Sequence, residues 1–197
     1  MEAYIRFFAG VTPQSTDMLL KAIDTKITQG ATKIHLIISS PGGSVFHGLS
    51  LYNYLKGIPI PVHTYNFGSV DSIGVVVFCA GQRRFSVPHA RFLMHGVSFN
   101  FQAGGQADEK QLIEYLKGLQ IDQNNIAKVI ADTCGYEAYK VLADMHNRTT
   151  LNPEESVAYG LVHTISSQLV PNKAQVVVIN EVQPGQTPVI QEVIFNG

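Results

Sequence analysis

The chain alternates short apolar segments with helical patterns, and glycines separate the two kinds of segment along most of its 197 residues. Residues 3–9 and 33–39 are strand-like apolar runs, and after each run apolar residues recur every three or four positions. Parallel strands need a long crossover connection, which is usually a helix. The alternation therefore predicts an α/β fold built from βαβ units around a largely parallel sheet.

Later segments continue this alternation. Residues 62–67 are predicted to form a third strand that ends at Gly68, whereas residues 73–80 are apolar throughout, which fits either a buried strand or a buried helix. The longest helical pattern covers residues 106–132, and a further strand is expected at residues 174–181. One stripe of the long helix carries the apolar residues Leu112, Tyr115, Leu116 and Leu119. This stripe is too long for one small domain to cover, so it predicts a contact with another subunit.

The chain contains no linker before about residue 170, which predicts one main domain at residues 1–169. Residues 170–197 contain three prolines and an alternating apolar segment, and they are predicted to form a strand-like tail. A strand in such a tail could add to the sheet of a neighbouring subunit.

Charge and cysteine usage narrow the function classes. Fourteen Lys+Arg against fifteen Asp+Glu leave a net charge of −1, which argues against nucleic acid and against a polybasic membrane anchor as partners. No apolar stretch reaches the roughly 18 residues of a membrane span, and Cys79 and Cys134 have no metal or redox spacing. The histidines show no paired spacing. We therefore expect a cytoplasmic protein without a metal, a cofactor or a disulfide.

Three places in the sequence contain residues suited to chemistry. The turn at residues 39–44, Ser-Ser-Pro-Gly-Gly-Ser, follows a strand and opens a helix, so its backbone N–H groups either serve the turn alone or bind a developing oxyanion. Ser72 opens the apolar segment at residues 73–80, where its hydroxyl is either an N-cap or a nucleophile. His95 ends a short apolar run, where it is either a hydrogen-bonded structural group or a general base.

Together, and in this order, the three features resemble the proteolytic subunits of the Clp protease, which are serine peptidases of the ClpP/crotonase fold. The resemblance covers residues 4–165, and its carriers are the blocks 5–8, 37–45, 68–81, 91–95 and 154–161. It implies a superhelix of βαβ units with a projecting handle helix at residues 106–132. It also implies that Ser72 is the nucleophile, that His95 is the general base, and that the N–H groups of Gly43 and Ile73 form the oxyanion hole.

The resemblance further suggests where a substrate binds. An extended peptide would lie between the segments 43–45 and 96–101, and backbone pairing would give it broad specificity. The residues assigned to substrate binding are Gly42, Ser44, Val45, Gly96 and Val97.

The third member of the triad departs from the family pattern. An alignment without gaps puts the family's aspartate at Arg148, which cannot accept a hydrogen bond from imidazole. The candidates nearby are Asn147, whose carbonyl can hold the tautomer but supplies no countercharge, and Asp144, which would need a shift of the loop. Asp71 also departs from the pattern, because the family tends to carry a small apolar residue before its nucleophile. We expect Asp71 to act as a favourable charge near a helix N-terminus.

The sequence therefore predicts a serine endopeptidase that hydrolyses peptides or unfolded polypeptides inside a homo-oligomer of heptameric rings. Residues 1–3 are too few for the family's axial loop, so from this sequence we do not expect docking of an ATPase partner. Two alternatives remain: an acyl-CoA enzyme of the crotonase fold, and a catalytically impaired ring component, which the missing aspartate suggests.

Overall fold

The computed structural model describes residues 1–99, 105–181 and 188–195. In its first half, strands and helices alternate as the sequence predicts. The elements are β1 (Glu2–Phe8), α1 (Pro13–Thr28), β2 (Lys33–Ser40), α2 (Val45–Gly57), β3 (Val62–Asp71), α3 (Ile73–Cys79), β4 (Arg83–Ser86) and β5 (Arg91–Leu93). The second half contains α4 (Glu109–Cys134), α5 (Ala138–His146), β6 (Thr150–Leu151), α6 (Pro153–Ala158), β7 (Thr164–Ile165), β8 (Gln175–Asn180) and β9 (Val189–Ile194).

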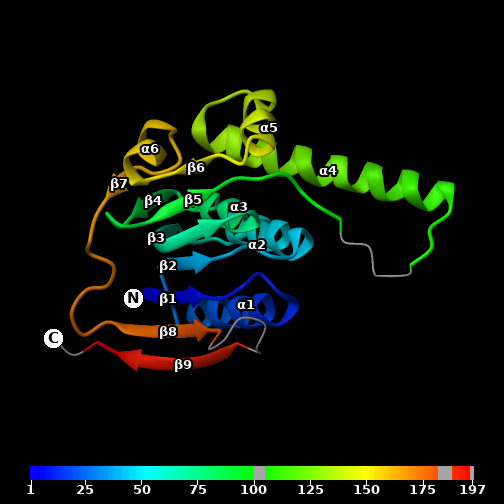
Figure 1. Cartoon of the computed structure of the whole chain (residues 1–197). Coiled ribbons are helices and arrows are strands. Elements are labelled where there is room, and N and C mark those ends of the chain that lie inside the picture. Colours follow the sequence, from blue (N-terminus) through cyan, green and yellow to red (C-terminus); the bar gives the residue numbers. More distant parts are fainter. Residues whose placement is uncertain (100–104, 182–187, 196–197) are drawn as a thin grey trace.

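One sheet organises the chain, with the strand order β6-β5-β3-β2-β1-β8-β9 (Figure 1). The strands β1, β2, β3 and β5 are parallel, whereas β6 and β9 pair antiparallel at the two ends of this order. Seven of the eight residues of β2 are buried, as expected for a central parallel strand that is covered on both faces. The larger core cluster joins the sheet to α1, α2 and α3, and a smaller one lies on the opposite face.

Tertiary contacts correct one local prediction and decide between the two alternatives of another. Gly68 does not end the third strand, since β3 continues to Asp71. The partner of β3 changes on either side of Gly68: residues 63–66 pair with β4, and residues 69–71 pair with β5. Residues 73–79 form the helix α3, and all seven are buried. Because apolar residues surround this helix on every side, its sequence shows no amphipathic period that could have distinguished it from a strand.

The C-terminal segment joins the sheet of its own chain. The strand β8 pairs with β1 in parallel, in the register Tyr4↔Val176 to Phe8↔Asn180, and β9 then pairs with β8. The pairing that the sequence suggested with a neighbouring subunit is thus made within the chain. The strand β9 was not predicted, since four of its six residues are apolar but they do not alternate cleanly with polar residues.

The helix α4 projects from the body of the molecule (Figure 1). Asp108 and Gln111 form a capping box at its start, and Gly135 ends it with a φ of 77°. Its buried residues all lie near the C-terminal end, from Ile126 to Ala131. Large apolar side chains in the projecting part stay exposed, and they include Leu112, Ile113 and Leu116. No helix among the described residues is long and apolar enough to cross a membrane.

A buried arginine in β4 is hydrogen-bonded to backbone carbonyls that lie far away in the sequence. Arg84 in β4 is 8% exposed, and within the described part of the chain its guanidinium donates hydrogen bonds to four backbone carbonyls. Its Nε lies 2.7 Å from the Leu161 oxygen, and its Nη2 lies 3.1 Å from the Gly160 oxygen. Arg84 thereby holds the turn after α6 against the sheet, and each carbonyl would lose its partner if the side chain were removed.

We expect Arg84→Met to lower the free energy of unfolding by about 3 kcal/mol, because the substitution leaves several buried carbonyls unsatisfied. Urea unfolding followed by circular dichroism measures the change. The exposed neighbour Arg83 provides the matched control, and Arg83→Met should change the stability by less than about 1 kcal/mol. Equal effects of the two substitutions would contradict the role of the Arg84 network.

Candidate active site

The glycine turn between β2 and α2 is held by two backbone hydrogen bonds to Val11. Val11 N–H donates to the Gly42 oxygen at 2.7 Å, and Ser44 N–H donates to the Val11 oxygen at 2.8 Å. Only glycine fits here, since Gly43 has a φ of 144° and a Cβ on it would lie 2.4 Å from the Val11 oxygen. The turn is therefore shaped by its neighbours and not by its own sequence alone.

Ser72 lies directly against this turn. A Cβ added to Gly42 would come within 2.6 Å of the Ser72 Cβ. Ser72 has φ 57° and ψ −130°, a sparsely populated conformation that costs on the order of 1–3 kcal/mol. It occupies the N-cap position of α3, but its hydroxyl makes no capping hydrogen bond. The interpretation of Ser72 as a simple N-cap is therefore wrong, and its strained backbone directs a free hydroxyl toward the turn.

Two backbone donors beside Ser72 are open. Among the described residues, neither the N–H of Gly43 nor that of Ile73 donates a hydrogen bond. Gly43 belongs to the turn, and Ile73 is the residue that follows Ser72. Unpaired backbone N–H groups are costly unless water or a ligand accepts from them. The arrangement is suited to binding an oxyanion that forms next to the Ser72 hydroxyl.

His95 follows β5, and the end of this strand is hydrogen-bonded to Ser72. Ser72 N–H donates to the Leu93 oxygen at 2.7 Å, and Leu93 lies two residues before His95. The His95 Nδ1 lies 2.8 Å from the carbonyl oxygen of Gly96. A carbonyl only accepts hydrogen bonds, so Nδ1 carries the proton and Nε2 presents a lone pair in the neutral ring. This is the tautomer that a general base requires.

The structure places the two candidates for a third triad member elsewhere. Among the described residues, no hydrogen bond joins His95 to Asp144 or Asn147. The Asp144 carboxylate instead accepts hydrogen bonds from Lys140 Nζ at 2.7 Å and from the Tyr159 hydroxyl at 2.6 Å. Asn147 is an exposed residue at the C-cap of α5. The sequence analysis did not consider the Gly96 carbonyl, because every residue has a backbone carbonyl and the residue type does not show which one meets His95.

Asp144 is connected to the residue before His95 through Thr149. Its backbone oxygen accepts from both the N–H and the hydroxyl of Thr149, at 3.1 and 2.9 Å. The Thr149 oxygen in turn accepts from Met94 N–H at 2.9 Å. Arg148, with a φ of 53°, makes the sharp bend that allows this connection. The end of α5 therefore positions the residue that precedes His95.

Asp71 anchors the end of β3. Its carboxylate accepts a hydrogen bond from Arg91 Nη2 at 2.8 Å and another from the Ser69 hydroxyl at 2.9 Å. Arg91 opens β5, so the ion pair joins the two strands that precede Ser72 and His95 in the chain. Asp71 directly precedes the N-cap residue of α3, where a charge was expected, and its carboxylate also makes these two specific contacts.

A groove of about 480 Å³ runs beside the glycine turn. Its walls are Gly43, Ser44 and Val45 from the turn, Val97, Ser98 and Phe99 from the segment after His95, and Glu114, Tyr115, Gly118, Leu119 and Asp122 from α4. Three of the five residues assigned to substrate binding, Ser44, Val45 and Val97, thus line one groove together with Gly43. Gly42 lies beneath it against Ser72, and Gly96 does not line it. Residues 100 and 101 of the expected substrate segment lie outside the described residues.

The wall that α4 supplies was not predicted. Tyr115 and Leu119 were expected to face another subunit, but both line the groove. The spacing Glu114-Gly118-Asp122 is the signal that could have indicated it, because residues four apart share one face of a helix.

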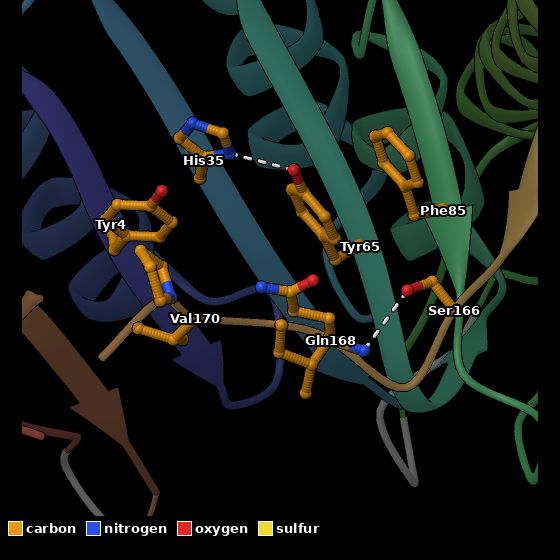
Figure 2. A pocket seen from close by; sticks show the side chains of 9 residues that line it. Tyr4, His35, Tyr65, Phe85, Ser166, Gln168 and Val170 are labelled. Atoms are coloured by element: carbon orange, nitrogen blue, oxygen red, sulfur yellow. Dashed lines mark hydrogen bonds between the residues drawn. The ribbon is translucent and has the colours of Figure 1, made fainter. Parts of the chain in front are cut away.

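A second hollow lies on the sheet face opposite α1–α3, and Figure 2 shows its aromatic wall. His35 Nδ1 accepts from the Tyr65 hydroxyl at 2.8 Å, and the His35 ring stacks on Tyr4 at 4.4 Å. Burial lowers the pKa of His35 below its usual range and raises the pKa of Tyr65 to about 12, so both groups stay neutral near pH 7. Residues 168–171 line the same hollow. The contacts around this hollow therefore attach the start of the tail to the body of the molecule.

The described residues contain no group of three or more His, Cys, Asp or Glu side chains that could hold a metal ion. Burial raises the pKa of the Cys79 thiol to about 12, which makes this sulfur a poor nucleophile. Among the groups described at this site, the serine hydroxyl, the histidine ring and the backbone donors are those suited to chemistry.

Comparison with known proteins identifies related chains. Residues 10–168 match the family model described as Clp protease. The ATP-dependent Clp protease proteolytic subunit 2 of Treponema denticola is 33% identical over 139 residues, which are 69% of this chain and 68% of that protein. Proteins with the same name from Chlamydia trachomatis serovar D and Chlamydia muridarum are 29% identical over 137 residues. The match covers 68% of this chain and 65% of each of these two relatives.

The contact between Gly42 and Ser72 can be tested by stability. Gly42→Ala should cost about 2 kcal/mol more than Gly30→Ala, because both glycines have a φ of 87° but only the Gly42 Cβ meets neighbours. Gly30 has no atom within 4 Å of that position, so it reports the cost of the backbone conformation alone. Thermal and urea unfolding of the two variants give the difference. A difference near zero would show that Ser72 does not depend on this contact.

Proposed function

Because the chain belongs to the Clp protease family, we propose that it is a serine peptidase that hydrolyses peptides or unfolded polypeptides. One observation carries the proposal. The Ser72 hydroxyl is free of a capping hydrogen bond, on a strained backbone beside two open N–H donors. A simple structural role for Ser72 would leave all three of these features without a cause.

The proposed reaction uses these groups in two steps. The Ser72 Oγ attacks the peptide carbonyl while His95 Nε2 takes its proton, and the N–H groups of Gly43 and Ile73 stabilise the oxyanion. His95 then gives the proton to the leaving amine, and an acyl-enzyme ester forms. A water molecule, deprotonated by His95, hydrolyses the ester and restores the serine. Each oxyanion donor contributes on the order of 3 kcal/mol to such a reaction.

The Gly96 carbonyl serves as the group that orients His95 in this proposal. It holds the proton on Nδ1, which is the role of the aspartate in a standard triad. A neutral carbonyl stabilises the imidazolium less than a carboxylate does, so the turnover should be lower than that of an enzyme with an aspartate. The backbone of Asp144 then positions Thr149, which contacts Met94, and Asn147 lies in the loop between them.

The groove beside the turn supports the location of the substrate. We place an extended peptide between the turn and residues 97–99, with Ser44, Val45 and Val97 at its sides. Gly42 and Gly96 directly precede the lining residues Gly43 and Val97. Hydrolysis by these groups needs only water, so it proceeds without ATP or another cofactor.

We also propose that the chain works as a homo-oligomer built from heptameric rings, as members of this family form oligomeric rings. The exposed apolar residues of α4 support this proposal. Leu112, Ile113 and Leu116 are 47–59% exposed, and they lie outside the lining of the groove. An apolar patch on a projecting helix is typical of an interface between subunits.

Ser72→Ala and His95→Ala should each lower peptide hydrolysis by about 10³-fold or more, since the serine is inert without its base. Both variants should also lose labelling by a fluorophosphonate probe, which reacts only with an activated serine. Circular dichroism and unfolding check that each variant is folded.

The matched controls are Asn147→Ala and Asp144→Asn, which should retain activity within about tenfold. Loss of activity in Asp144→Asn as large as in His95→Ala would assign the orienting role to Asp144 and not to Gly96. A folded protein that is never labelled by the probe would favour a non-catalytic ring component.

Light scattering at micromolar concentration should give a mass of several subunits, and Leu116→Glu should reduce it because a carboxylate on the exposed stripe opposes apolar packing. Lys117→Glu, at an adjacent exposed position, is the control and should keep the assembly. A monomeric wild-type protein would contradict the proposed oligomer.

A further inference from the structure

The groove beside the glycine turn has an acidic wall. Of its eleven lining residues, Glu114 and Asp122 carry charge, and both are carboxylates. The lysines in this half of the helix, Lys110 and Lys117, do not line the groove. Among the described residues, neither Glu114 nor Asp122 forms an ion pair.

The two carboxylates are arranged along one ridge of α4. Glu114, Gly118 and Asp122 follow each other at intervals of four residues, so they lie on the same face. Eight residues of α-helix span about 12 Å. Gly118 between them has no side chain and meets no atom within 4 Å, which leaves the space between the two charges open.

Asp122 is the more enclosed of the two groups. Burial raises its pKa, because the ionised carboxylate gives up part of its hydration. A cation placed beside it would replace the lost hydration. The opposite wall contains the neutral residues Ser44, Val45 and Val97, so no charge of the groove competes for such a cation.

We infer that this groove selects extended peptides that carry lysine or arginine, and that it selects most strongly for two cationic side chains four residues apart. This inference rests on the proposed function, since it names the class of peptide that the same site takes. An extended peptide rises about 3.3 Å per residue, so positions i and i+4 lie about 13 Å apart and point to the same side. That spacing matches the distance between Glu114 and Asp122, whereas positions i and i+3 point to opposite sides.

The test measures binding to the Ser72→Ala variant by fluorescence anisotropy, so that it does not depend on turnover. The probes are four labelled twelve-residue peptides of neutral background: one without charge, one with lysines at i and i+4, one with lysines at i and i+3, and one with glutamates at i and i+4. An exposed ion pair contributes about two- to fivefold in affinity. We expect the i,i+4 lysine peptide to bind about four- to twentyfold more tightly than the neutral peptide, the i,i+3 peptide to bind less tightly, and the glutamate peptide to bind most weakly.

The variant Glu114→Gln/Asp122→Asn should bring the ratio between the i,i+4 lysine peptide and the neutral peptide close to one. The control Glu109→Gln/Asp132→Asn removes two carboxylates of the same helix that do not line the groove, and it should keep the ratio. Salt near 1 M, where the Debye length is about 3 Å, should also reduce the ratio.

The outcomes separate this inference from the proposed function. Equal binding of the neutral and lysine peptides, or equal binding of the two lysine spacings, would overturn the inference even if wild-type protein cleaves peptides. Selective binding by the Ser72→Ala variant, together with a wild-type protein that is neither labelled nor active, would support the inference and contradict the proposed chemistry.

Discussion

The close approach of three backbone segments at the glycine turn is the constraint on which the candidate site depends. Val11 pairs with the turn on one side, and Ser72 lies against Gly42 on the other. A side chain at either glycine would overlap these neighbours. The strained backbone of Ser72 persists because the surrounding contacts determine its position, and the free energy that it costs is offset by the buried core of β2, β3 and α3.

Around this centre, polar contacts connect strand ends that the hydrophobic core alone would leave loosely placed. The pair of Asp71 and Arg91 joins β3 to β5, and Arg84 holds the turn after α6. The hydrogen bonds from Asp144 through Thr149 to Met94 fix the strand that precedes His95. Each contact is directional, so it sets the relative positions of Ser72 and His95 more narrowly than apolar packing does.

Much of the fold could be predicted from the sequence because its signals are local. The helix α6 begins where Asn152 and Glu155 form a capping box around Pro153, and α1 and β2 follow their apolar periods. The candidate site could be predicted only in part. Ser72 and His95 are chemically distinctive residues, whereas the Gly96 carbonyl and the groove wall at Gly118 depend on backbone position and on an empty space. Asp144 was a candidate for the third triad member because it carries a charge. In the structure its carboxylate accepts hydrogen bonds from Lys140 and Tyr159.

The sequence by itself determined the order of the βαβ units, the positions of the glycine turns and the residue types available for chemistry, because these follow from periodicity and from the conformational range of single residues. Tertiary structure decided that β3 passes through Gly68, that residues 73–79 are a helix, and that β8 joins β1. It also decided which groups meet His95 and which carboxylates face the groove. Such contacts join residues far apart in the chain, and no local pattern specifies the distance between them.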